Sequence, residues 1–156
     1  MNWLQFAVQW LHVLLGILWF GYALSMYFLV TPALRELPES QGRITTGRLG
    51  EIGGRVFPIV SVLVLLLGVI RGTVFGPIDS IDDLFGTAYG WTFIVALLAT
   101  LGLFYTGARY LGPGFTALRE APDYLAAAAR VRRIAQIDLG LFFIVFTCMI
   151  LMRFGL

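Results

Sequence analysis

The sequence has very little charge, a single cysteine and no lysine. Only 13% of its 156 residues are charged and 59% are hydrophobic, whereas soluble domains carry about a quarter charged residues. This composition excludes an ordinary water-soluble domain, and the net charge of +2 gives no sign of a nucleic-acid partner. The lone Cys148 excludes a disulfide within the chain and a zinc site built from several cysteines of one chain.

Four long apolar blocks follow one another along the chain. They are separated by charged or glycine- and proline-rich breaks, and they predict helices at about residues 3–34, 56–76, 86–111 and 124–154. Each block is long enough to cross a bilayer, which takes about 20 residues. Because no block alternates with period two, a transmembrane β-barrel is excluded. The sequence therefore predicts an all-α integral membrane four-helix bundle, forming one transmembrane domain over residues 1–156.

The arginines predict how this bundle is oriented. They gather before the second and the fourth block, at Arg35, Arg43, Arg48, Arg55, Arg109, Arg119, Arg130, Arg132 and Arg133. The loop at residues 76–86 instead carries three aspartates and no basic residue. Basic loops stay in the cytoplasm, so we expect both termini on the outer, periplasmic or extracellular side. The membrane expected for such a chain is the bacterial cytoplasmic (inner) membrane.

Polar and small residues fall on one face of three of the helices, at steps of three and four residues. These faces comprise Gln5, Gln9, His12 and Gly16 on the first helix, Ser61, Gly68, Arg71 and Gly72 on the second, and Asp138, Phe142, Val145, Met149 and Met152 on the fourth. Because polar groups are costly in lipid, they normally face the bundle interior. The three faces are therefore predicted to look toward one another.

The polar groups divide into two layers. A rise of about 1.5 Å per residue puts His12, Arg71 and Met149 at similar depths in the outer half of the bundle. Asp138 and Arg109 belong to the cytoplasmic half, where we predict that Asp138 forms a structural ion pair with Arg109, or else with Arg55 or Arg133, and a proton relay is its alternative role. Two roles of His12 stay open. It could be a cofactor ligand, or a packing residue that is hydrogen-bonded to a neighbouring helix.

The residues around His12 resemble a known group of membrane proteins. The stretch Trp-Leu-His-Val-Leu-Leu-Gly-Ile-Leu-Trp-Phe-Gly at 10–21, followed by Thr-Pro-Ala-Leu at 31–34, is similar to the first helix of the copper-resistance-D-like proteins. A similar pattern occurs in the HemJ-type protoporphyrinogen oxidases and in the membrane part of the cytochrome-linked urate oxidases. The Arg-Val-Phe-Pro sequence at 55–58 also resembles this group. The resemblance implies a four-helix topology over the whole chain.

The members of this group imply different functions. In HemJ-like proteins a histidine of the first helix holds haem b, so the resemblance implies His12 as an axial ligand. That enzyme also has a lysine in the third helix, and the absence of lysine here argues against porphyrinogen oxidation. Copper-resistance-D-like proteins are associated with copper uptake or handling. For copper, His12 with Cys148, Met149 and Met152 would supply imidazole and sulfur ligands suited to Cu(I); these sulfur positions are read from this sequence and are no signature of the group.

Our leading hypothesis is a membrane-embedded haem b-binding or related redox protein, with His12 as axial ligand and Arg71 meeting a propionate. With one histidine per chain, ligation by two histidines needs a homodimer or a partner subunit. Copper uptake or handling is one alternative. The other is a cofactor-free accessory subunit of a larger respiratory or photosynthetic membrane complex. The expected partners are the lipid bilayer and a homo-oligomer or larger complex, and whether the chain is an enzyme stays open.

Overall fold

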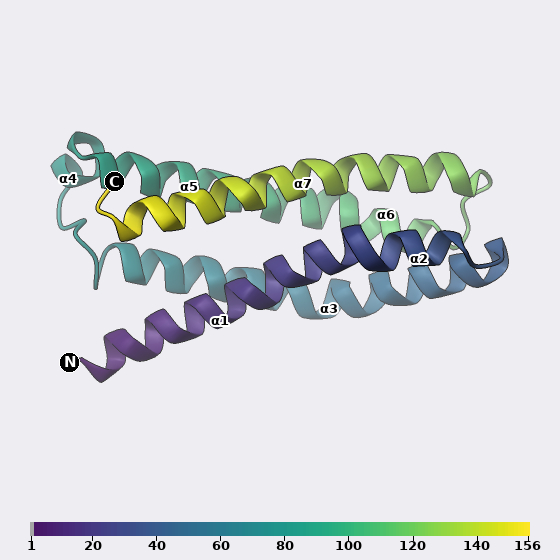
Figure 1. The fold of residues 1–156 in the computed structure, drawn as a ribbon, viewed down its shortest axis with the longest axis horizontal. Coiled ribbons are helices and arrows are strands. Elements are labelled where there is room, and N and C mark those ends of the chain that lie inside the picture. The colour runs from purple at the N-terminus through teal and green to yellow at the C-terminus, as the bar shows by residue number, and fades with distance from the viewer. Residues whose placement is uncertain (1) are drawn as a thin grey trace.

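The computed structural model describes residues 2–156, and every regular element in them is helical (Figure 1). Four helical segments are each long and apolar enough to cross a membrane: Trp3–Arg35, Glu39–Gly72, Ala88–Ala117 and Tyr124–Arg153. The prediction of an all-α protein with four transmembrane helices is confirmed.

The four helices form two antiparallel hairpins. The first hairpin consists of α1 (Trp3–Ser25), the π-helical η1 (Met26–Val30), α2 (Thr31–Arg35) and the returning α3 (Glu39–Gly72). The second consists of α5 (Ala88–Thr106), the π-helical η2 (Gly107–Leu111), α6 (Gly112–Ala117) and the returning α7 (Tyr124–Arg153). Figure 1 shows both termini and the connecting α4 (Ile81–Gly86) at one end, which we call the terminal end. The tight turns of the two hairpins lie at the other, the turn end.

The two hairpins are built on the same plan. In each, a π-helical turn is followed two residues later by a proline, Pro32 in one and Pro113 in the other. Proline cannot donate the usual helical hydrogen bond, and its ring crowds the carbonyl four residues earlier. The widened π turn just before each proline lets the helix continue past it instead of ending. The sequence Ala-Leu-Arg-Glu then recurs, at 33–36 and at 117–120, each time two residues before a second proline.

Three helix boundaries differ from the sequence prediction by more than two residues, and one of them is the end of the second helix, which lies at Gly72 and not at residue 76. The second helix begins at Glu39 and not near residue 56, because the five glycines between Gly42 and Gly54 are helical. A Cβ atom added to Gly50 would lie 2.6 Å from the Cβ of Phe115, so glycine here permits close packing of α3 against α6. The third helix runs to Ala117, beyond the expected end at residue 111. The first and fourth helices end within a residue of their predicted limits.

The start of the fourth helix and the short α4 are both fixed by capping side chains. The Asp123 carboxylate accepts a hydrogen bond from the amide of Ala126, which satisfies one of the free N–H groups of the first turn of α7. At α4, the Ser80 hydroxyl and the Asp79 amide donate to the Asp83 carboxylate, and these bonds lower the pKa of Asp83. The α4 cap is therefore formed at neutral pH and weakens as the pH falls through that lowered value.

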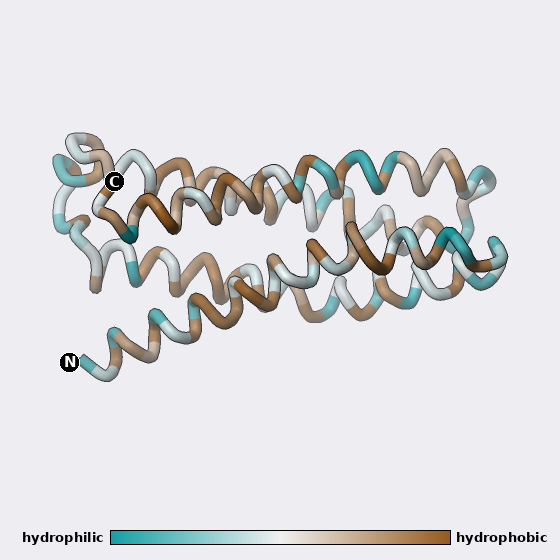
Figure 2. Tube along the Cα trace, in the orientation of Figure 1, coloured by the Kyte–Doolittle hydropathy of each residue, from teal (hydrophilic) through white to brown (hydrophobic). Residues whose placement is uncertain are grey.

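Packing is tighter within each hairpin than between them. α1 packs on α3 and α5 packs on α7, while the hairpins meet mainly where α6 lies against α3. α1 and α7 touch through aromatic rings, with Trp19 and Phe20 at 5.0 and 5.3 Å from Phe142 between ring centroids. Figure 1 shows α1 diverging from α7 from there toward the N-terminus. Hydrophilic residues concentrate at the two ends and apolar ones between them (Figure 2).

The predicted inward faces are confirmed by burial. On α7, Asp138, Phe142 and Cys148 are buried. On α3, Ser61 and Gly72 are buried. The face of α1 that carries Gln5, Gln9, His12 and Gly16 is half-buried along its whole length.

Candidate functional site: a polar layer and an interhelical cavity

The side chain of His12 extends from α1 to α3, where a backbone carbonyl orients its ring. Its Nδ1 is 3.0 Å from the carbonyl oxygen of Val64. Since a carbonyl can only accept, Nδ1 carries the proton and Nε2 keeps a lone pair. A Cβ atom added to Gly68 would lie 2.9 Å from Cε1 of the imidazole. Glycine at this position therefore makes the room that the ring occupies.

The second ring nitrogen of His12 has no hydrogen-bond partner among residues 2–156. No fully buried side-chain nitrogen or oxygen in that range lacks a partner, so Nε2 reaches the surface of the chain. In a membrane-spanning helix, a polar atom that faces hydrocarbon without a partner is unfavourable. The lone pair of Nε2 is thus available to a ligand.

Arg71 anchors the same layer closer to the terminal end. Its Nε donates to the side-chain oxygen of Gln9 at 2.7 Å, and its Nη1 donates to the carbonyl oxygen of Phe75 at 2.7 Å. The side-chain amide of Gln5 lies 3.5 Å from the same carbonyl. Nη2 of Arg71 has no partner among the described residues. The guanidinium is therefore held in place with one donor group still unused.

The sulfur atoms proposed as copper ligands lie on another helix. Cys148, Met149 and Met152 belong to α7, which packs on α5, whereas the polar contact of His12 is to α3. α1 and α7 separate toward the terminal end (Figure 1). Within residues 2–156 no three or more His, Cys, Asp or Glu side chains gather as a metal site. The fold therefore places the proposed copper ligands on two diverging helices.

Asp138 has a different partner from the one predicted. Its buried carboxylate accepts a hydrogen bond of 2.5 Å from the Thr106 hydroxyl. Arg109 is exposed in the π-helical η2, with its guanidinium 5.5 Å from the ring centroid of Tyr110. Neither Asp138 nor Arg109 belongs to an ion pair within the described part of the chain. Thr106 takes the place of Arg109 because it lies a turn earlier, on the α5 face that packs on α7.

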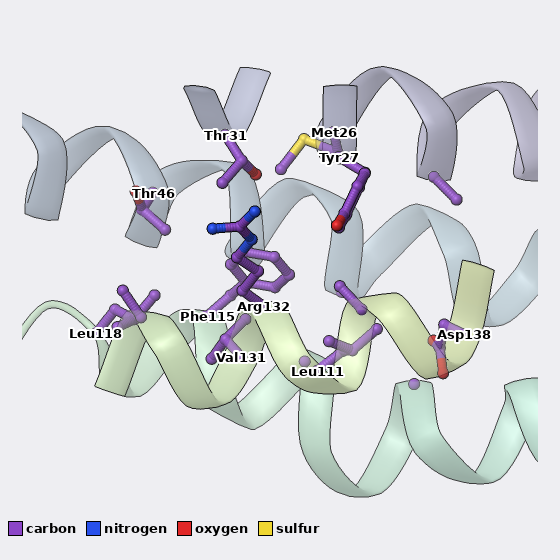
Figure 3. A pocket seen from close by; sticks show the side chains of 18 of the residues that line it. Met26, Tyr27, Thr31, Thr46, Leu111, Phe115, Leu118, Val131, Arg132 and Asp138 are labelled. Carbon is purple, nitrogen blue, oxygen red and sulfur yellow. The ribbon is translucent and has the colours of Figure 1, made fainter. Parts of the chain in front are cut away.

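A large cavity separates the two hairpins in the half of the bundle nearer the turn end. Its volume is about 1040 Å³, and its walls come from every long helix (Figure 3). Trp19, Phe57 and Phe142 make part of its apolar wall, and Asp138 also lines it. Neither His12 nor Arg71 is among the lining residues. The outer polar layer and the cavity are therefore separate features of the molecule.

Two arginines close one side of this cavity at the turn end. Arg43 on α3 donates to the carbonyl oxygens of Ala121 and Leu118, at 2.7 and 3.4 Å. Arg119 pairs with Glu51 of α3 at 2.8 Å. These contacts fasten the second turn to the first hairpin. Sequence reasoning placed these arginines in a cytoplasmic loop and missed their structural role, because nothing in their spacing indicates which carbonyls lie nearby.

The fold and the two sites define a transmembrane protein of two helical hairpins, with a half-buried histidine in one half and a large cavity in the other. No family model, no curated protein and no solved structure matches the chain. The function must accordingly be argued from the residues themselves.

Proposed function

We propose that the chain is a membrane-embedded haem b-binding redox protein in which Nε2 of His12 is an axial ligand of the iron. The observation that carries the proposal is the bond between Nδ1 of His12 and the carbonyl oxygen of Val64. Histidines that bind metals usually donate their other ring N–H to a carbonyl or a carboxylate, which fixes the tautomer and the ring orientation. A bound haem b would supply one-electron transfer. This chain would supply the axial ligand and the electrostatic environment of the haem.

The residues near His12 fit part of a haem site. Arg71 lies in the same layer, and its unused Nη2 is suited to a carboxylate such as a propionate. The cavity between the hairpins does not reach His12, so one chain does not enclose a haem there. The open side of α1 would be completed by a second copy or a companion subunit, and a second copy would bring the second histidine.

The absorption spectrum and metal content of the purified protein test the proposal and separate it from both alternatives. A Soret band with an α-band that appears on dithionite reduction supports haem. Copper without porphyrin would replace the proposal with copper handling. A colourless, metal-free protein would leave the accessory-subunit role. Asp138→Asn provides a control, because this residue lies in the other half of the bundle and its change should leave the spectrum intact.

A further inference from the structure

Positive charge without a carboxylate partner gathers at the turn end of the cavity. Arg35 from α2 and Arg132 from α7 both line it, and neither belongs to an ion pair within residues 2–156. Figure 3 shows the Arg132 side chain reaching toward Thr31.

Two carboxylates that line this end of the cavity are already paired with arginines, while the third lining carboxylate, Asp138, lies deeper and is hydrogen-bonded to Thr106. Glu39 pairs with Arg43 at 2.7 Å. Glu51 pairs with Arg48 at 3.2 Å and with Arg119 at 2.8 Å. The net charge left facing the cavity at this end is therefore positive, and it comes from Arg35 and Arg132. Guanidinium groups bind phosphate with two parallel hydrogen bonds and suit an anionic headgroup.

Beyond the arginines the cavity becomes a mainly apolar slot, whose wall also carries the Asp138 carboxylate bonded to Thr106. Ten residues of α7 separate Arg132 from Phe142, a rise of about 15 Å along the helix. Trp19 and Phe57 face the slot from the first hairpin. A cavity of about 1040 Å³ lies at the upper end of the range for ligand sites in proteins. The combination of a cationic mouth and an apolar slot matches a molecule with an anionic head and a hydrocarbon tail.

A lipid would enter the cavity sideways from the bilayer, on the side where α2 and η1 face α7. The side between α3 and the second turn is fastened by Arg43 and Arg119. On the opposite side α2 packs on α3 and η1, while α7 packs mainly on α5. The stretch of α7 that lines the cavity there carries small side chains, among them Ala128 and Ala135. The hydrogen bond of 2.9 Å from Gln136 to Tyr27 joins the two hairpins on this side.

We propose that the cavity binds an anionic membrane phospholipid, with its phosphate held by Arg35 and Arg132 and one acyl chain lying along α7 toward Phe142. The site does not depend on the haem proposal, since His12 lies outside the cavity. The lipid fills a space that would otherwise expose the Asp138 and Thr106 pair to water at the turn end.

Trp19 provides a fluorescent probe inside the cavity. Trp3, Trp10 and Trp91 are exposed and can be replaced by phenylalanine, which leaves Trp19 as the only indole. This protein is placed in phosphatidylcholine bilayers that contain a minor fraction of lipid with brominated acyl chains, which quench indole fluorescence on contact. One series carries brominated phosphatidylglycerol and the other brominated phosphatidylcholine. We expect stronger quenching of Trp19 by the anionic lipid at every equal fraction.

Matched arginine variants decide whether the cavity is responsible. Replacing both Arg35 and Arg132 by glutamine should lower the apparent affinity for phosphatidylglycerol by about tenfold per arginine, because each change removes a charged hydrogen bond to the phosphate. Replacing Arg130 and Arg133, which lie outside the cavity, should leave it unchanged. Ala135→Phe, which fills the slot, should abolish the preference while the arginines remain. Equal quenching by the two lipids would overturn the proposal, and so would an equal loss in both arginine pairs, because surface attraction would then explain the preference.

Discussion

The Thr106 hydroxyl on α5 donates a hydrogen bond to the buried Asp138 carboxylate on α7, joining the two helices of the second hairpin. We expect Thr106→Val to destabilise the protein by about 1 kcal/mol, while Thr106→Ser, which keeps the hydroxyl, costs less. Adding Asp138→Leu to Thr106→Val should recover part of the loss, because removing both partners leaves no unsatisfied polar group. Thermal unfolding in detergent measures these differences. Additive losses in the double variant would contradict the assigned pairing.

The contact between Arg43 and the second turn predicts a second stability effect. Arg43→Gln removes a charged donor from the Ala121 carbonyl and should cost about 1–2 kcal/mol. It should also speed proteolysis within residues 118–123. Arg130→Gln is the control, since Arg130 is exposed and takes part in no ion pair of the described residues. Equal protease sensitivity of the two variants would show that Arg43 does not fasten this turn.

The glycines of α3 predict a sharp contrast between neighbouring positions. Gly50→Ala would place a methyl group 2.6 Å from the Cβ of Phe115 and 3.4 Å from its backbone carbon, which cannot yield without moving α6. We expect a loss of about 1–3 kcal/mol. Gly54→Ala meets no atom within 4 Å, and its higher helix propensity should stabilise the protein by up to about 1 kcal/mol. Thermal unfolding of the pair tests this packing, and a similar shift in both would refute it.

These glycines also show where the sequence misleads. Between residues 42 and 54 they have the composition of a loop, but a long helix tolerates them because α6 and the Tyr22 side chain of α1 pack closely on α3 there. Pro113 also has the composition of a helix end, and the third helix was expected to stop at residue 111. The π-helical turn before Pro113 permits the helix to continue. The apolar blocks themselves were long enough to leave no ambiguity, so the four helices and their inward faces could be predicted.

Side-chain partners across helices were less predictable than the helices. His12 and Arg71 could be placed at similar depths from the helical rise, and the structure brings Arg71 into contact with Gln9, which periodicity had placed on the inward face of α1. The partner of Asp138 could not be predicted, because the sequence does not indicate which residues of α5 face α7 at that depth. The cavity could not be predicted either, because it results from incomplete packing between the two hairpins. The repeated Ala-Leu-Arg-Glu sequence at 33–36 and 117–120 was a visible signal for the two matching turns.

Membrane orientation is a prediction from the arginines and can be tested by chemical labelling. In a Cys148→Ala background, a cysteine at Asp82 should react with a membrane-impermeant maleimide added to intact cells. Cysteines at Ser40 and Ala121, both at the turn end, should react only after the membrane is opened. The reverse pattern would place the arginine-rich turns outside. It would also move the proposed lipid site to the outer leaflet.

Imidazole rescue of a His12 variant tests the central claim most directly. If Nε2 of His12 binds haem iron, His12→Ala should lose the Soret band or shift it to another spin state, and added imidazole should restore much of the native spectrum. His12→Gln should fold but should not restore it. Leu11→Ala, on the exposed neighbouring position, should keep the wild-type spectrum. A His12→Ala protein with an unaltered spectrum, or a wild-type protein without haem, would contradict the claim.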